Sequence, residues 1–132
     1  MKVIVCLDDN NGMMFNRRRQ SSDAVLTRRI AELAAGSKLW VSPYTAKLFT
    51  DYSVCVADDF LKQAEAGDYC FVEDADVVAH MDRIEKLIVY RWNRSYPSDQ
   101  KFPALGAQWR LVATEEFEGN SHPVITEEVY VR

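Results

Sequence analysis

The feature that most constrains the fold is an apolar run near the start of the chain, Val3-Ile4-Val5-Cys6-Leu7. It has the length of a strand and no polar alternation, which is typical of a strand covered on both faces in a parallel sheet. It ends at Asp8-Asp9-Asn10-Asn11-Gly12, whose residue types favour a tight turn. Ligands of open α/β sheets bind beyond the carboxyl ends of the strands, so this turn is a candidate site, although a solvated turn explains it equally well.

A helix is expected after this turn, with Ser21 or Ser22 as its N-cap. Its apolar stripe consists of Leu26, Ile30 and Leu33. Asp23 lies three residues before Leu26 and therefore shares the inward face of the first turn. The helix dipole alone explains an acid there. The alternative is a carboxylate at the floor of a cleft, able to bind an amidine-like group or to direct a proton.

Strands and helices alternate along the rest of the chain and predict one α/β domain over residues 1–132. The expected strands are 38–42, 53–57, 69–72 and 85–92, and the expected helices are 43–49, 58–66 and 75–81. In the last two expected strands, 109–117 and 124–131, apolar and polar residues alternate more regularly, and a polar loop lies between the strands. They predict an antiparallel hairpin added to a mostly parallel sheet.

The composition fits a globular domain and excludes several classes of protein. With 132 residues, 48% of them apolar, the chain is long enough for one real core. A net charge of −4 argues against a general nucleic-acid binder. No apolar run approaches the ~18 residues of a membrane span, and no secretory signal is apparent.

Cysteine and histidine spacing favours no metal or triad chemistry. Cys6, Cys55 and Cys70 lie in apolar runs without C-x-x-C spacing, so we interpret them as reduced core residues of a cytoplasmic protein. His80 and His122 are far apart, and no serine and aspartate arrangement marks a catalytic triad. No metal constellation supports an RNA-processing enzyme built on the basic run 17–19.

Motifs at the two ends of the chain occur in a recognisable order. The first strand, the turn and the acid that opens the helix are followed near the other end by YPSDQKFP at 96–103, WRLV at 109–112, NSH at 120–122 and EVY at 128–130. Together they resemble the dihydrofolate reductase family. The resemblance implies a single-domain α/β fold, with a mixed, mostly parallel central sheet flanked by helices and a C-terminal antiparallel hairpin.

The resemblance also implies a pocket. Asp23 matches the acid that orients the pterin and favours its protonation in the family. By resemblance Cys6, Thr45 and Tyr90 are possible pocket walls, although core packing explains Tyr90 equally well. Arg18 and Arg19 replace the family's tryptophan and prolines before the acid, and could hold a phosphate or carboxylate ligand. A solvated basic loop is the alternative.

The cofactor positions depart from the family. Where the resemblance places a Gly-Gly pair, after the strand 69–72, the chain has Glu73-Asp74, and two carboxylates there would repel a diphosphate. Ser42-Pro43 replaces a Gly-Arg pair after the second strand, and Asp58-Asp59 replaces the Ser/Thr and Arg after the third. We therefore expect no NADPH bound in the family's usual mode.

Three functional hypotheses follow. The first is a divergent member that binds a pterin- or nucleotide-like ligand near Asp23 without the usual NADPH mode. The second is a genuine NADPH-dependent dihydrofolate reductase. The third is a non-enzymatic interaction module, with possible self-association through a sheet edge near Val124–Val131.

Overall fold

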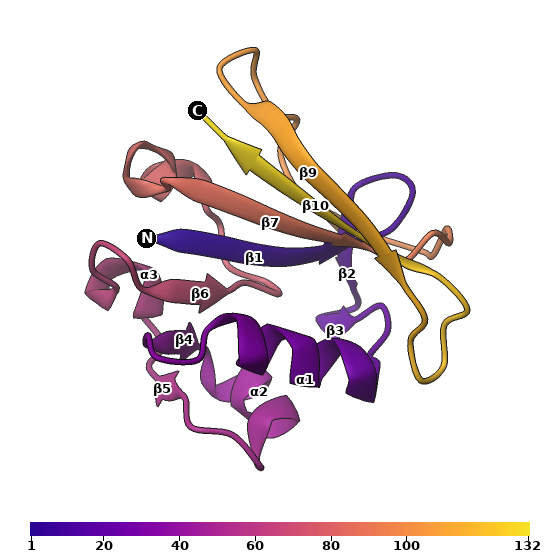
Figure 1. Cartoon of the computed structure of the whole chain (residues 1–132), viewed down its shortest axis with the longest axis horizontal. Helices are drawn as coiled ribbons and strands as arrows, with labels where there is room; N and C mark the ends of the chain where they lie inside the picture. The colour runs from indigo at the N-terminus through magenta and orange to yellow at the C-terminus, as the bar shows by residue number, and fades with distance from the viewer.

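The structure is a computed structural model that describes residues 1–132, and it is built on a seven-stranded sheet (Figure 1). The strands run in the spatial order β5-β4-β6-β1-β7-β10-β9. Their bounds are β1 Lys2–Leu7, β4 Leu39–Val41, β5 Cys55–Val56, β6 Tyr69–Phe71, β7 Lys86–Arg91, β9 Arg110–Phe117 and β10 Ile125–Val131. The first five strands of this order pair in parallel, whereas β10 pairs antiparallel with both β7 and β9. The expected mixed sheet with an antiparallel finish is confirmed.

A second, three-stranded sheet was not expected from the sequence. It consists of β2 Gly12–Phe15, β3 Arg18–Arg19 and β8 Gln100–Lys101, in the order β3-β2-β8. The sequence suggested only a turn and a basic loop here. Asn16 and Arg17 both adopt positive φ angles, 52° and 60°, and this left-handed turn matches the twist of a two-residue hairpin. The hairpin carries Arg18 and Arg19 toward the carboxyl end of β1.

The first helix, α1 Ala24–Leu33, begins one or two residues later than predicted. Its N-cap is Asp23 itself, which accepts hydrogen bonds from the backbone N–H groups of Val25 and Leu26, because a carboxylate there satisfies the free helix donors. Leu26 and Ile30 are buried as expected, but Leu33 is 37% exposed because the helix ends at that residue.

The other helices are short. They are α2 Pro43–Ala46, the 3₁₀ helix η1 Lys47–Phe49, α3 Phe60–Gln63 and the 3₁₀ helix η2 Val78–Arg83, which replaces the helix expected at 75–81. Ser42 caps α2 through the Thr45 N–H, and Pro43 occupies the first turn, where its missing N–H costs nothing. None of the helices has the length and apolar character needed to span a membrane.

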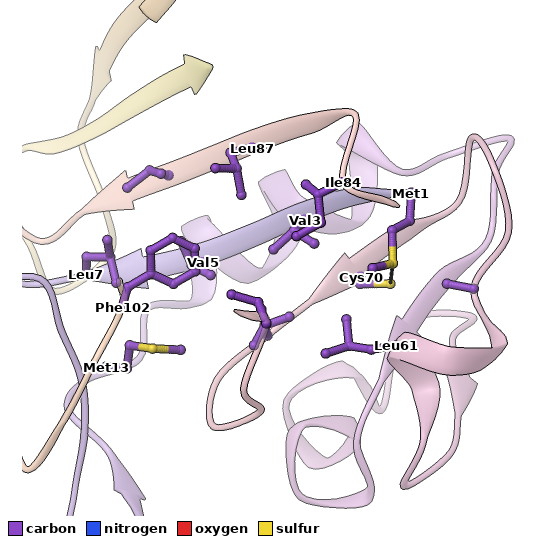
Figure 2. Packing of buried hydrophobic residues seen from close by; sticks show 14 of the residues in the cluster. Met1, Val3, Val5, Leu7, Met13, Leu61, Cys70, Ile84, Leu87 and Phe102 are labelled. Carbon is purple, nitrogen blue, oxygen red and sulfur yellow. Dashed lines mark hydrogen bonds between the residues drawn. The ribbon is translucent and has the colours of Figure 1, made fainter. Parts of the chain in front are cut away.

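The core has two clusters, one on each face of the sheet. Val3, Val5 and Leu7 of β1 point to one face and Ile4 to the other, as strand alternation requires. In Figure 2 the first set of β1 side chains faces Phe102 and Met13 across the cluster. The opposite face is covered by α1, so β1 is buried on both sides, as the unbroken apolar run predicts.

The free edge of the sheet lies at β9. The free edge was expected near Val124–Val131, and this expectation is wrong, because β10 is paired on both sides. β9 ends the strand order, and its side chains from Arg110 to Glu116 are exposed. In Figure 1 α1 lies below β1, and the loop that connects β9 to β10 bends down beside the start of α1.

Candidate functional site

A narrow pocket lies beyond the carboxyl ends of β1, β6 and β7, between α1 and the β2–β3 hairpin. It has a cavity volume of about 20 Å³, enough for about one water molecule. Its lining mixes apolar side chains, including Met13, Leu26, Ile30 and Trp92, with the polar segment 19–23 and Glu73. This is the position at which open α/β sheets bind ligands. A larger occupant requires movement of a side chain that lines the pocket.

Arg19 is one of the lining side chains, and it is held in place by an acid and an aromatic ring. Its Nε and Nη2 atoms donate to the two carboxylate oxygens of Glu73 at 2.8 and 3.0 Å, and its guanidinium lies 4.3 Å from the centre of the Tyr44 ring. The hydroxyl of Thr45 donates to Glu73 Oε1 at 2.8 Å. Burial by itself would lower the pKa of Arg19, but the hydrogen bonds and charge of Glu73 outweigh burial and raise it. The pocket thus contains a fully formed guanidinium-binding arrangement.

Beside this pair lies a buried acceptor without a partner. Gln20 Nε2 donates to Asp8 Oδ2 at 3.1 Å and to the Pro97 carbonyl at 3.3 Å, while Gln20 Oε1 is buried and makes no hydrogen bond. Gly12 permits this close packing, because a Cβ there would lie 2.5 Å from Gln20 Nε2. Gln20 lines the pocket, so its orphaned oxygen can accept from a bound molecule.

Asp8, from the turn singled out in the sequence, is a structural carboxylate. Its side chain accepts from the N–H groups of Asn10, Gly12 and Tyr96 at 2.7–3.1 Å, as well as from Gln20. Burial alone would raise the pKa of Asp8, but these hydrogen bonds outweigh burial and lower it. Asp8 therefore fixes the loop that holds Gln20 and Tyr96.

Asp23 is buried, and both of its oxygens are engaged. Oδ1 accepts from the N–H groups of Val25, Leu26 and Asn120 at 2.9–3.2 Å. Oδ2 accepts from the N–H of Ser121 at 2.9 Å, from Ser121 Oγ at 3.3 Å and from His122 Nδ1 at 3.0 Å. Burial opposes ionisation, but the bonds from residues 120–122 outweigh burial and hold the pKa of Asp23 well below its usual value. Asp23 thus ties the start of α1 to the β9–β10 loop.

His122 joins Asp23 to a serine of the pocket. Its Nε2 lies 3.0 Å from Ser21 Oγ and 3.4 Å from the Tyr96 hydroxyl, and its ring stacks on Trp92 with 4.6 Å between ring centres. Ser21, His122 and Asp23 thus form a hydrogen-bonded series that the sequence did not reveal, because Ser21 and His122 are 101 residues apart. The sequence places the motif NSH at 120–122 only in the polar loop between the last two strands.

Of the other predicted pocket residues, two lie at the pocket or act on it, and two lie elsewhere. Cys6 lines the pocket, and burial, reinforced by the charge of Glu73, raises the pKa of its thiol well above the usual value. Thr45 does not line the pocket itself, but its hydroxyl donates to Glu73, which does. Tyr90 is not a lining residue: it is buried in the core beneath α1, and its hydroxyl donates to Glu127 Oε2 at 2.7 Å. Arg18 borders a separate outer hollow with Phe15, Tyr96 and Pro97.

The residues at the expected cofactor positions do not fit a diphosphate. Ser42 Oγ is used by Thr45, Pro43 has no N–H to offer, and residues 58–59 are exposed carboxylates. Glu73 is paired with Arg19, so the expected repulsion comes mainly from Asp74. Neither parallel neighbour of β1 is followed by a glycine pair: Val72-Glu73 follows β6 and Trp92-Asn93 follows β7. No group of three or more metal-ligating side chains comes together either.

Comparison with known proteins supports the fold and leaves the chemistry open. No protein-family model matches the sequence, and no curated protein matches it. Among solved structures, the chain is similar to dihydrofolate reductase from Enterococcus faecalis complexed with NADP(H) and RAB-propyl, with a TM-score of 0.71 and 15% sequence identity. The match covers 99% of this chain and 95% of the other. The chain therefore has a dihydrofolate reductase-like fold.

Proposed function

We propose that this protein binds a small, flat, pterin- or nucleotide-like molecule in the pocket between β1 and α1, without NADPH in the family's usual mode. One observation carries the proposal: Glu73 already grips a guanidinium group through two hydrogen bonds. A pterin presents a similar pair of parallel donors to a carboxylate, through its N3–H and its 2-amino group. Such a ligand would replace the Arg19 side chain at Glu73.

The remaining groups of the pocket suit the same ligand. Thr45 orients Glu73, Gln20 Oε1 offers an unused acceptor, and Trp92 and Leu26 supply apolar surface for a ring. Arg19 lies on the short strand β3, which pairs only with β2, so its side chain can leave without breaking the main sheet. The reduced cysteines are consistent with the cytoplasmic setting expected from the sequence.

Calorimetric titration with pterin, folate and 2,4-diaminopyrimidine tests this proposal. We expect micromolar binding to the unmodified protein and at least about tenfold weaker binding to Glu73→Gln, equivalent to about 1.4 kcal/mol. Asp74→Asn is the matched control, because that neighbouring carboxylate is exposed and makes no side-chain hydrogen bond. Arg19→Gln should tighten binding by removing the competing guanidinium. No heat with any of the three compounds would refute a pterin-type pocket.

A genuine NADPH-dependent reductase is the second candidate. It is favoured by the extent of the fold match, since the similar Enterococcus faecalis enzyme was solved in complex with NADP(H). It requires an acid able to direct a proton, and Asp23 has both oxygens occupied by backbone and His122 donors. Folate-dependent oxidation of NADPH is the assay. A rate that falls strongly in Asp23→Asn, at a temperature where the variant remains folded, would favour this candidate over the first.

The third candidate, an interaction module, is favoured by the exposed edge strand β9. An unpaired strand edge is a template for pairing with another chain. Light scattering would distinguish it: a concentration-dependent dimer that is abolished by Val112→Pro supports self-association, whereas a strictly monomeric mass removes that form of the proposal.

A further inference from the structure

Ser21, His122 and Asp23 meet at the rim of the pocket in the geometry of a nucleophile, a base and a positioning acid. The Ser21 Oγ to His122 Nε2 distance is 3.0 Å, and the His122 Nδ1 to Asp23 Oδ2 distance is also 3.0 Å. Both lie within hydrogen-bond range for nucleophilic catalysis. A triad is recognised by such geometry and not by sequence order, so the separation of these residues along the chain is no objection.

The proton positions follow from the ionisation of Asp23. Its carboxylate can only accept hydrogen bonds, so the neighbouring Nδ1 of His122 carries the ring proton. When the ring carries that proton alone, Nε2 is an acceptor for the hydroxyl of Ser21. The lone pair that must remove the serine proton therefore already faces that proton.

The surroundings hold the imidazole in place. His122 is 3% exposed, and its ring is stacked on Trp92, which is also buried. Asp23 is itself fixed by the N–H groups of Asn120 and Ser121. A base held this firmly loses little entropy when it acts. Ser21, in contrast, is half-buried and lines the pocket, so a substrate can reach its hydroxyl.

Donors for a developing oxyanion are also at hand. The backbone N–H groups of Ser21 and Ser22 make no hydrogen bond within the protein. One belongs to the nucleophile itself and the other to the residue after it, and backbone donors so placed can stabilise the tetrahedral intermediates of acyl transfer. Leu26 and Ile30 line the interior behind Ser21, and the cavity, which has room for about one water molecule, favours the smallest acyl groups.

We infer that Ser21 is the nucleophile of an acyl-transfer site that hydrolyses short-chain carboxylic esters. Ser21 Oγ attacks the carbonyl carbon and its proton passes to His122 Nε2, while the carbonyl π electrons move to oxygen. The carbonyl re-forms, the bond to the alcohol oxygen breaks, and the alcohol leaves with the proton from Nε2. Water then loses a proton to Nε2, attacks the acyl-serine, and releases the carboxylic acid and the original hydroxyl. Asp23 is a positioning residue that acts through His122.

Covalent labelling tests this inference directly. A fluorophosphonate probe should add to the unmodified protein at Ser21, as located by peptide mass spectrometry, and p-nitrophenyl acetate should be hydrolysed. Ser21→Ala should abolish the adduct, and His122→Gln should slow labelling by at least about 10²-fold. Ser22→Ala is the matched control, because that neighbouring serine is exposed and its hydroxyl contacts no histidine, and it should label normally.

Either of two results would overturn the inference. If no adduct forms at Ser21, or if ester hydrolysis is the same in Ser21→Ala as in the unmodified protein, Ser21 is not a nucleophile. The positioning role of Asp23 has its own readout, the far-downfield proton NMR signal of His122 Nδ1–H. That signal should persist in Ser21→Ala and vanish in Asp23→Asn. Its persistence in Asp23→Asn would remove Asp23 from the series.

This inference goes beyond the proposed ligand binding and shares only the pocket with it. The two fail separately, because pterin binding depends on Glu73 and labelling depends on Ser21. Ser21→Ala should therefore retain the calorimetric binding of pterin, and Glu73→Gln should retain the fluorophosphonate adduct. Loss of both properties in either variant would show that the two sites are not independent.

Discussion

Replacement of Asp23 by asparagine tests whether this acid holds the β9–β10 loop against α1. The least disruptive placement keeps the asparagine oxygen at the Oδ1 position, where Val25, Leu26 and Asn120 donate. The amide NH₂ then stands at the Oδ2 position and faces the N–H of Ser121 and Nδ1 of His122. The N–H of Ser121 and the Nδ1–H of His122 therefore both face the donor NH₂ of the asparagine, where the native protein has a carboxylate acceptor.

The energetic consequence can be worked from these two contacts. A donor left without its acceptor costs about 1–3 kcal/mol, and a hydrogen bond to a charged group contributes about 1.5–3 kcal/mol. His122 can recover its contact by moving its ring proton to Nε2, so the two losses do not add fully. We expect Asp23→Asn to lower the free energy of unfolding by about 2–5 kcal/mol. With an m value of about 2 kcal/mol/M, the urea midpoint should fall by at least about 1 M.

Urea unfolding followed by tryptophan fluorescence measures this loss, with Asp51→Asn as the control, since Asp51 is exposed and unbonded. The pH dependence has a definite sign. Because the pKa of folded Asp23 lies below its unfolded value of about 3.9, its contribution is complete above about pH 5 and is lost as pH falls below about 4. The stability gap between the unmodified protein and Asp23→Asn should narrow in that range. A loss below about 1 kcal/mol at pH 7, or a gap independent of pH, would refute the reasoning.

Three further outcomes follow from the same structure. Gly119→Ala should destabilise the protein by about 1–3 kcal/mol in urea, because its Cβ would lie 2.5 Å from Asp23 Oδ2, and an unchanged midpoint would contradict that packing. Cys6 should react with a thiol reagent far more slowly in the folded than in the unfolded protein, because burial raises its pKa; equal rates would be contrary evidence. Arg29→Met should lower the free energy of unfolding by only about 1 kcal/mol, because the ion pair of Arg29 with Glu127 is partly exposed, and by less in high salt. A loss above about 3 kcal/mol would show that the ion pair has a larger role.

The sheet was predictable because its strands carry strong local signals. The unbroken run at β1 indicated burial on both faces, and the alternating final strands indicated the hairpin, as the pairing of β10 with β9 confirms. The small β2–β3–β8 sheet was missed, because its strands are two to four residues long and β3 consists of arginines, which do not favour strands. The tight turn at Asn16 and Arg17, and not strand propensity, forms that hairpin.

The site was only partly predictable, because its key contacts join distant segments. The sequence singled out Asp23 as a candidate site residue, but it could not show that the loop at 120–122 would occupy both carboxylate oxygens. The sequence predicts that Arg19 holds a phosphate or carboxylate ligand or is solvated, and it could not show that Arg19 pairs with the carboxylate of Glu73, 54 residues away. For Tyr90 the sequence left a pocket wall and core packing open, and the structure places its side chain in the core.

The most direct test of the central claim is a fluorescence titration of the unmodified protein, since Trp92 lines the pocket and reports on its occupancy. Pterin and NADPH are titrated separately, each also against Glu73→Gln. We expect saturable quenching by pterin in the micromolar range, with weaker pterin binding in Glu73→Gln. We expect no quenching by NADPH up to millimolar concentration beyond the inner-filter correction. Micromolar NADPH binding, together with pterin binding that Glu73→Gln leaves unchanged, would contradict the account.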